Sequence, residues 1–101
     1  MTWVRVARAE DVAEGTARVV EAGGKRLALC HTADGFYAID DMCTHDRGPL
    51  DQGTLIGNRI ECPRHGAQFD VTTGRAVVLP AVRPVRTYPT RVANGDVEIE
   101  V

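Results

Sequence analysis

Two short motifs that combine cysteine and histidine constrain this chain most: Cys43-Thr44-His45 and, after a gap of sixteen residues, Cys62-Pro63-Arg64-His65. The chain holds only three cysteines and three histidines, so the two motifs take most of both residue types. Two thiolates and two imidazoles make a complete four-ligand set for a metal centre. Such ligands suit zinc and iron–sulfur clusters better than magnesium or calcium. The fold must therefore bring two separate segments together at one metal site.

The order of the ligands helps to separate zinc from an iron–sulfur cluster. Zinc fingers commonly pair like with like at short spacing, as C-x2–4-C and H-x3–5-H. Here each motif pairs unlike ligands, C-x-H and C-x2-H. This pattern fits a cluster with two chemically different irons, one bound by both cysteines and the other by both histidines. It is the Rieske pattern, in which two histidines replace two cysteines on one iron of a [2Fe–2S] centre.

The chain resembles the Rieske proteins, and among them the Rieske-type ferredoxins of bacterial multicomponent oxygenase systems. The matching residues are Cys43-Thr44-His45-Asp46, Cys62-Pro63-Arg64-His65-Gly66-Ala67-Gln68-Phe69-Asp70, Thr73-Gly74 and Pro80. Chain length, motif placement and the opening at Trp3 extend the resemblance over essentially the whole chain. It implies one Rieske-type [2Fe–2S] cluster per chain, with Cys43 and Cys62 on the inner iron and His45 and His65 on the outer, solvent-near iron.

The remainder of the sequence predicts an all-β fold. Apolar and alternating runs favour strands at 3–7, 16–20, 25–30, 36–40, 90–93 and 96–101, with a helical turn at 9–12. Gly23-Gly24 predicts one hairpin, and Asn94-Gly95 predicts another with a type I′ turn. Between about 41 and 80, repeated glycines and prolines indicate loops interrupted by short strands.

We therefore predict a single domain, 1–101, with a base formed by 1–40 and 81–101 and a cluster-binding insertion at 41–80. The resemblance implies the Rieske fold, an antiparallel β-sandwich base with a loop-rich subdomain that holds the cluster at its tip between two loops. Pro80 is expected in a third loop over the cluster. Cys30 and His31 lie outside both motifs. Cys30 is predicted to be a small buried apolar residue, and His31 a structural or surface side chain.

Charge and hydropathy limit the partners and the location. The formal net charge is −2, which provides no basic field for nucleic acid. No apolar run approaches the ~20 residues of a membrane span. The first five residues show no signal-peptide stretch, and an odd number of cysteines argues against a disulfide framework. We expect a monomer in the cytoplasm that binds neither nucleic acid nor membrane.

The sequence lacks the residues of an enzyme. Once the cluster is built only His31 remains, whereas a mononuclear oxygenase iron needs two histidines and a carboxylate. No G-x-G-x-x-G motif and no P-loop is present. We therefore predict a one-electron carrier that is not itself an enzyme. It would pass electrons from a flavin-containing, NAD(P)H-dependent ferredoxin reductase to a terminal aromatic-ring oxygenase, docking near His45 and His65.

The neighbours of the ligands predict a low reduction potential. Histidine ligation gives a neutral oxidised site, which is easier to reduce than an all-thiolate one. By the same resemblance, high-potential Rieske proteins carry a serine and a tyrosine where this chain has Ala67 and Phe69. They also carry a disulfide between the positions of Gly48 and Arg64. This chain has neither device, so we expect a potential of roughly −150 mV.

Several interpretations stay open from the sequence alone. The chain also fits a Rieske-like small subunit of a larger reductase such as nitrite reductase, or a zinc-binding or iron–sulfur-sensing module. Asp46, Arg47 and Arg64 lie beside the ligands, either as a rim read by redox partners or as solvated surface charge. Gln68 and Asp70 could brace the loops through hydrogen bonds.

Overall fold

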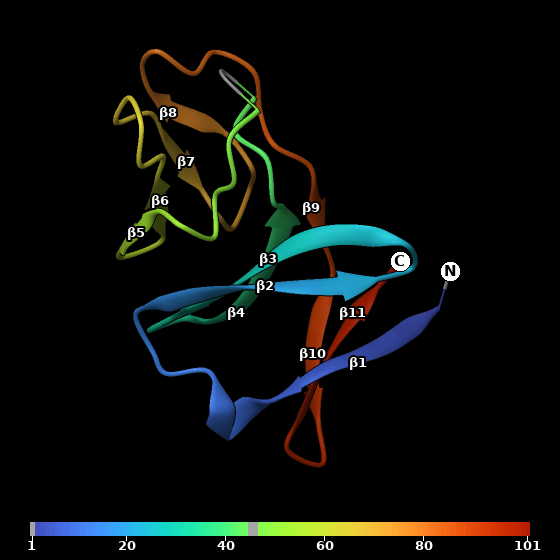
Figure 1. Ribbon diagram of the computed structural model, residues 1–101. Coiled ribbons are helices and arrows are strands. Elements are labelled where there is room, and N and C mark those ends of the chain that lie inside the picture. The colour runs from blue at the N-terminus through green and yellow to red at the C-terminus, as the bar shows by residue number, and fades with distance from the viewer. Residues whose placement is uncertain (1, 45–46) are drawn as a thin grey trace.

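The computed structural model describes residues 2–44 and 47–101, and within them the chain is built almost entirely of antiparallel strands (Figure 1). In chain order the elements are β1 (Trp3–Arg8), the 3-10 helix η1 (Ala9–Asp11), β2 (Thr16–Ala22), β3 (Lys25–Thr32), β4 (Gly35–Asp40), β5 (Thr54–Ile56), β6 (Arg59–Glu61), β7 (Gln68–Asp70), β8 (Ala76–Val78), β9 (Thr87–Tyr88), β10 (Thr90–Ala93) and β11 (Asp96–Glu100). The all-β prediction is confirmed. No helix in the described residues is long and apolar enough to cross a membrane.

The strands form three sheets with the orders β1-β11-β10, β2-β3-β4-β9 and β5-β6-β7-β8. In Figure 1 the β5–β8 sheet lies at one end of the molecule, together with the long connections that precede and follow it. The other two sheets lie at the opposite end. Because β9 returns from this small sheet to pair with β4, the chain leaves the base and re-enters it at neighbouring strands.

The β10–β11 hairpin has the turn that its sequence predicts. Asn94 and Gly95 have φ values of 53° and 79°, and a type I′ turn requires φ > 0 at both central residues. Beyond the turn, Val97 and Ile99 are fully buried, while Glu98 between them is only half-buried. The predicted alternation of this strand is therefore confirmed.

Strand β3 is the central element because it contributes to two separate cores. Its residues Leu27, Ala28, Leu29 and Cys30 are all fully buried. Successive side chains of a strand point to opposite faces, so this continuous burial means that both faces are covered. Leu27 and Leu29 face the sandwich core, whose buried members are Val12, Val20, Ala22, Leu27, Leu29, Ala38, Tyr88, Val97 and Ile99.

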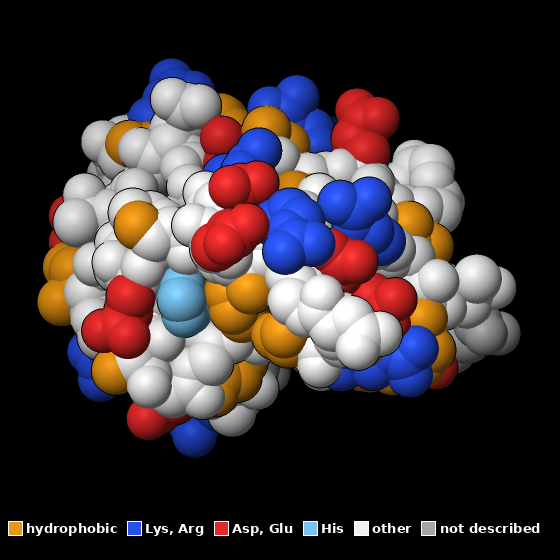
Figure 2. Space-filling model, turned by 90° about the horizontal axis from the view of Figure 1, so that it is seen from below, with side chains coloured by type: hydrophobic (Ala, Val, Ile, Leu, Met, Phe, Trp, Pro, Cys, Tyr) orange, Lys and Arg blue, Asp and Glu red, His pale blue; other side chains and the backbone are white. Residues whose placement is uncertain are grey.

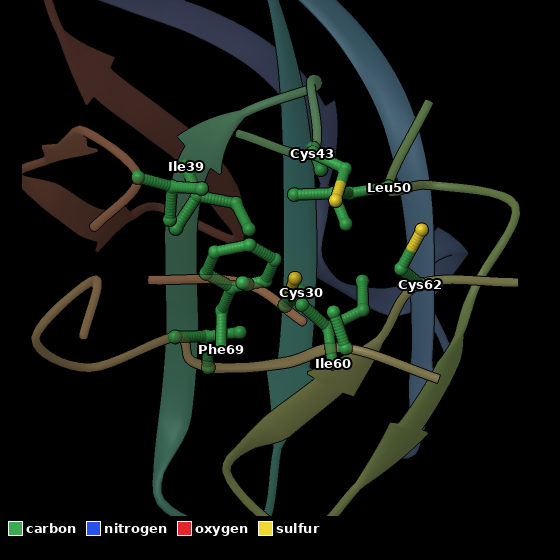
Figure 3. Packing of buried hydrophobic residues seen from close by; sticks show 12 residues of the cluster. Cys30, Ile39, Cys43, Leu50, Ile60, Cys62 and Phe69 are labelled. Atoms are coloured by element: carbon green, nitrogen blue, oxygen red, sulfur yellow. The ribbon is translucent and has the colours of Figure 1, made fainter. Parts of the chain in front are cut away.

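The opposite face of β3 contributes to a second core, here called the cysteine core. Its buried members are Ala28, Cys30, Ile39, Cys43, Leu50, Ile60, Cys62, Ala67, Phe69, Val71, Ala81 and Val85 (Figure 3). Cys30 is thus the buried, apolar-like residue that was predicted. His31 follows it on β3, where its ring stacks on Phe36 at 4.0 Å and its Nδ1 lies 2.7 Å from the Val12 carbonyl oxygen. Of the two roles predicted for His31, these contacts favour the structural one.

Candidate metal centre

Both predicted cysteine ligands lie in loops that follow strands, and both belong to the cysteine core. Cys43 lies in the connection between β4 and β5, residues 41–53, here called the first cysteine loop. Cys62 follows β6 directly and begins the second cysteine loop (62–67). Both side chains are buried, and Figure 3 shows them on two neighbouring segments of the same core. The fold therefore brings together two cysteines that are far apart in sequence, as the two motifs predict.

The first cysteine loop forms a tight turn immediately after Cys43. The Arg47 backbone N–H donates to the Cys43 carbonyl at 2.7 Å, and the Cys43 N–H donates to the Gly48 carbonyl at 2.8 Å. Arg47 adopts a φ of 63°, which is uncommon for a residue with a side chain. The two hydrogen bonds close a short ring that holds Cys43 in place.

The second cysteine loop repeats this arrangement at the same spacing. The Gly66 N–H donates to the Cys62 carbonyl at 3.2 Å, and the Cys62 N–H donates to the Ala67 carbonyl at 2.7 Å. Gly66, four residues after the cysteine like Arg47, has a φ of 74°. A glycine adopts this conformation without steric cost. Two matched backbone turns therefore present the two thiols.

Of the two predicted histidine ligands, the structure describes only His65. His65 lies in the second cysteine loop and is exposed, in contrast to the buried Cys62 three residues before it. His45, like Asp46, lies outside the described residues, so its role stays a prediction. Among the described residues no group of three or more Cys, His, Asp or Glu side chains could hold a single metal ion. A Rieske cluster does not need one, since each of its irons takes only two side chains.

A third loop (79–86), between β8 and β9, contacts the first cysteine loop. The Thr44 hydroxyl donates to the Arg83 carbonyl oxygen at 2.7 Å. Ala81 and Val85 are buried in the cysteine core. Pro80 is half-buried in this loop. The sequence pointed to such a loop through Pro80 but gave no sign of the contact made by Thr44.

A buried carboxylate anchors the first cysteine loop to the base. Asp41 accepts hydrogen bonds from Arg26 Nε at 2.8 Å and from the Asp51 backbone N–H at 2.7 Å. Burial raises the pKa of Asp41, but these hydrogen bonds outweigh it and the pKa lies below its ordinary value. Burial and the neighbouring Asp41 raise the pKa of Asp51. Sequence reasoning missed this group, although Asp41 stands only two residues before Cys43.

Polar residues near the second cysteine loop brace the strands more than the loop itself. Gln68 Nε2 donates to Glu61 Oε2 at 3.0 Å across the β6–β7 pair. Asp70 Oδ1 accepts from the Thr72 hydroxyl and backbone N–H, and the hydroxyl contact is the main reason why the pKa of Asp70 lies below its ordinary value. Ala67 and Phe69 are fully buried, and neither side chain carries a hydroxyl. The hydrogen bonds of Gln68 and Asp70 thus brace the β6–β7 pair and the turn after β7, whereas the sequence suggested that they brace the cysteine loops.

Comparison with known proteins places this centre in a family. Residues 2–89 match the family model of the Rieske [2Fe-2S] domain. The chain therefore belongs to the Rieske [2Fe-2S] family, and its cofactor is a Rieske-type [2Fe–2S] cluster. The residues present fit that cofactor, because two buried thiols and an exposed imidazole are ligands of the kind it takes.

Within the family, the chain is similar to ferredoxins of dioxygenase systems. It is 37% identical to the ferredoxin component of the Pseudomonas putida naphthalene 1,2-dioxygenase system, over 98% of this chain and 95% of the relative. It is 39% identical to a 3-phenylpropionate/cinnamic acid dioxygenase ferredoxin subunit of Photorhabdus laumondii, over 100% and 96% of the two chains.

Solved structures show the same similarity. The ferredoxin of carbazole 1,9a-dioxygenase from Nocardioides aromaticivorans superimposes with a TM-score of 0.94 at 34% identity, over 98% of this chain and 97% of that one. A chain in the complex of reduced oxygenase and oxidized ferredoxin of carbazole 1,9a-dioxygenase gives a TM-score of 0.90 at 40% identity, over 96% and 91%. A solved structure described as a putative nitrite reductase small subunit gives a TM-score of 0.85 at 20% identity, over 100% of both chains, which shows the fold alone.

Proposed function

We propose that this protein is the one-electron carrier of a multicomponent oxygenase system. It would accept electrons from an NAD(P)H-dependent, flavin-containing ferredoxin reductase and deliver them to a terminal oxygenase that acts on an aromatic ring. The support comes from relatives that match nearly full length and are themselves ferredoxin components of naphthalene and phenylpropionate dioxygenase systems. The complex of oxygenase and ferredoxin in carbazole 1,9a-dioxygenase supports docking onto an oxygenase.

We further propose that Cys43 and Cys62 hold the inner iron and that His45 and His65 hold the outer iron. The observation that carries this assignment is the contrast in exposure between the buried Cys62 and the exposed His65 on one short loop. When bound, the cluster supplies reversible one-electron reduction. The protein's part is to keep water from the thiolate side and to present the imidazole side to a partner, which shortens the electron path.

The sheets support the proposed division of the single domain into a base and a cluster-binding insertion. Strands β1–β4 and β9–β11 fall within 1–40 and 81–101, whereas β5–β8 fall within 41–80. The two parts share the cysteine core, to which the base contributes Ala28, Cys30 and Ile39. We propose that the base is the rigid support on which both cysteine loops are held.

We propose that the protein carries electrons and has no catalytic residues of its own. His31, the one histidine outside the two motifs, is occupied by its contacts with Phe36 and the Val12 carbonyl. We propose that the protein acts as a monomer in the cytoplasm, with no catalytic site. Purification of the chain alone separates this proposal from the alternative. A carrier should be stable, coloured and monomeric, whereas a fixed small subunit of a reductase should be unstable or colourless without its partner.

Visible absorption and electron paramagnetic resonance of the anaerobically purified protein test the proposal. We expect a coloured protein with iron and sulfide in a ratio of about one to one, and a Rieske-type signal after reduction with dithionite. A colourless protein that contains zinc would favour the zinc-binding alternative. A reduced, iron-containing protein without the Rieske-type signal would contradict the ligand assignment.

A further inference from the structure

The third loop exposes apolar side chains beside the first cysteine loop. Leu79 and Val82 are 73% and 76% exposed, more than any other large apolar side chain among the described residues. Ala81 and Val85 of the same loop are buried in the cysteine core. Ala81 and Val85 therefore anchor the loop, while the side chains of Leu79 and Val82 face solvent. In Figure 1 it forms the orange connection at the end of the molecule opposite β1.

Several contacts hold this loop in one position. The Arg83 carbonyl accepts a hydrogen bond from Thr44, and the Val85 N–H donates to the Gly74 carbonyl at 2.8 Å. Pro80 and Pro84 restrict φ on either side of Val82. A surface that is already ordered loses little conformational freedom on binding. Leu79 and Val82 are thus suited to docking against a partner.

The segment 42–86, which contains the third loop, exposes mainly cations. The exposed arginines of the segment 42–86 are Arg47, Arg59, Arg64, Arg75, Arg83 and Arg86. The described carboxylates in this segment, Asp51, Glu61 and Asp70, are half-buried and accept hydrogen bonds from Gln52, Gln68 and Thr72 respectively. This part of the chain therefore exposes mainly cations, although the whole chain has a net charge of −2.

The base carries a different pattern of charge. Glu10, Asp11, Glu14 and Glu21 are exposed there. Figure 2 shows the molecule from the side opposite the third loop, where acidic and basic side chains are interspersed. Several of the base arginines form ion pairs, such as Arg5 with Asp96 and Arg91 with Glu98. Among the ion pairs of the described residues, none involves Arg47 or Arg83.

We propose that Arg47, Leu79, Val82 and Arg83 form the docking surface of this carrier, and that it fits a protein surface with an apolar centre and a rim of carboxylates. The proposal rests on the proposed function and specifies the chemistry of the redox partner. Protein interfaces commonly combine an apolar core with a polar rim, and arginine is enriched in them. Complementary charge at the rim steers encounter and selects among partners.

The first test maps where an anion approaches the cluster-loaded, oxidised protein. Hexacyanochromate(III), a redox-inert paramagnetic trianion, broadens the NMR signals of the groups that it approaches. We expect stronger broadening of the Leu79 and Val82 methyl signals than of Val19 and Val92, which are exposed valines of β2 and β10. The cation hexaamminechromium(III) should reverse this order. Equal broadening at all four residues, or a preference of the third loop for the cation, would overturn the proposal.

The second test measures binding of acidic polypeptides by calorimetry at low ionic strength. Poly-L-glutamate should bind the Arg83→Gln variant about two- to fivefold more weakly than the parent, the effect of one partly screened ion pair. Arg18→Gln, a matched change at an exposed arginine of β2, should bind like the parent. If the two variants bind equally, Arg83 has no role in docking.

A third test compares a serine substitution in the apolar part of the docking surface with one at an exposed apolar residue of the base. A random copolymer of glutamate and tyrosine should bind Leu79→Ser less tightly than Val92→Ser, while hexacyanochromate(III) broadens the Val82 methyl signals equally in both variants. Equal affinities would overturn the apolar centre. Tighter binding of a single-stranded oligonucleotide than of the copolymer at equal charge would overturn the choice of a protein partner.

These tests separate the docking surface from the proposed function. A protein that lacks the Rieske-type signal after reduction contradicts the function, whatever it binds. A protein with the signal, in which the third-loop variants behave like their controls, contradicts the docking surface alone.

Discussion

The carboxylate of Asp41 accepts a hydrogen bond of 2.7 Å from the backbone N–H of Asp51, and this contact closes the first cysteine loop. The second oxygen of Asp41 accepts from Arg26 Nε at 2.8 Å, which ties the closed loop to β3. The Asp41 side chain is fully buried, whereas that of Arg26 is 60% exposed. Cys43 lies between the two bridged residues, so its position depends on a carboxylate that is not itself a ligand.

We expect Asp41→Asn to lower the free energy of unfolding by about 1–3 kcal/mol, because an amide cannot keep charge-assisted hydrogen bonds to both partners. Arg26→Gln should cost less than Asp41→Asn, because its guanidinium is largely solvated. Urea unfolding of the cluster-loaded proteins, followed by visible absorption and circular dichroism, measures both values. A loss for Asp41→Asn no larger than that for Arg26→Gln would show that the buried carboxylate does not organise the loop.

Gly74 allows the third loop to approach the turn before β8. Its φ is 82°, and a Cβ atom at this position would lie 2.2 Å from the Val85 carbonyl oxygen. We expect Gly74→Ala to destabilise the protein by more than about 2 kcal/mol, because strain in the left-handed region adds to a backbone clash. Gly57 has a similar φ of 59°, but a Cβ atom there would meet nothing within 4 Å, so Gly57→Ala should cost only the strain of about 1 kcal/mol. Chemical denaturation compares the free energies of unfolding of the two variants. Equal losses would show that the third loop shifts away from the added Cβ atom without a measurable cost.

The strands of the base could be predicted from sequence because their patterns are local. The alternation around Val97 and Ile99 and the turn at Asn94-Gly95 fix both strand and register. Strands β5–β8 have only three residues each, too few for a periodic pattern, so the sequence indicated loops with short strands and no bounds. The two-residue strand β9 of the base was not predicted. The pairing of β9 depends on a contact between distant segments, Ala38 of β4 with Tyr88.

The candidate site was predictable to a similar degree. Ligand type and spacing pointed to Cys43, Cys62 and the two histidines, because cysteine and histidine are rare and chemically specific. The Asp41–Asp51 and Thr44–Arg83 contacts were not predictable, since aspartate, threonine and a carbonyl oxygen occur everywhere on protein surfaces. Only the folded chain shows that these contacts are made.

The reduction potential should respond to a hydroxyl placed beside the cysteines. The parent should have a potential of roughly −150 mV, and a value positive by more than about 100 mV would contradict the low-potential assignment. We expect Ala67→Ser to raise the potential by on the order of 40 mV, the equivalent of one hydrogen bond of about 1 kcal/mol in a one-electron couple. Ala38→Ser, a buried change in the sandwich core, should leave it unchanged. Voltammetry of the cluster-loaded variants would refute the prediction if the two variants shifted alike.

Tyr88 should make the stability depend on pH in the alkaline range. It is 8% exposed and its hydroxyl donates to Asp40 Oδ1 at 2.7 Å; burial and this hydrogen bond raise its pKa to about 12. The unfolded tyrosine ionises near pH ~10 while the folded one keeps its proton, so stability is constant below pH ~10. It then falls by about 1.4 kcal/mol per pH unit until pH reaches the folded pKa.

Urea unfolding between pH 9 and 12 measures this slope. Because burial also raises the pKa of the Cys30 thiol to about 12, all variants should carry Cys30→Ala. Tyr88→Phe should remove the part of the slope that begins near pH ~10, and Tyr37→Phe should retain it. A slope that persists unchanged in Tyr88→Phe would assign it to another group.

The last prediction separates the cysteine ligands from the cysteine that only fills space. Cys62 and Cys30 are both buried in the cysteine core, so serine at either position places a hydroxyl in an apolar site. We expect Cys62→Ser to lose the cluster, with its iron, colour and Rieske-type signal, and to unfold at markedly lower denaturant because the cluster ties the two cysteine loops together. Cys30→Ser should keep the cluster and its signal, with a loss of about 1–3 kcal/mol from burying a hydroxyl. Iron and sulfide analysis with electron paramagnetic resonance distinguishes the two, and retention of a normal signal in Cys62→Ser would remove this residue from the ligand set.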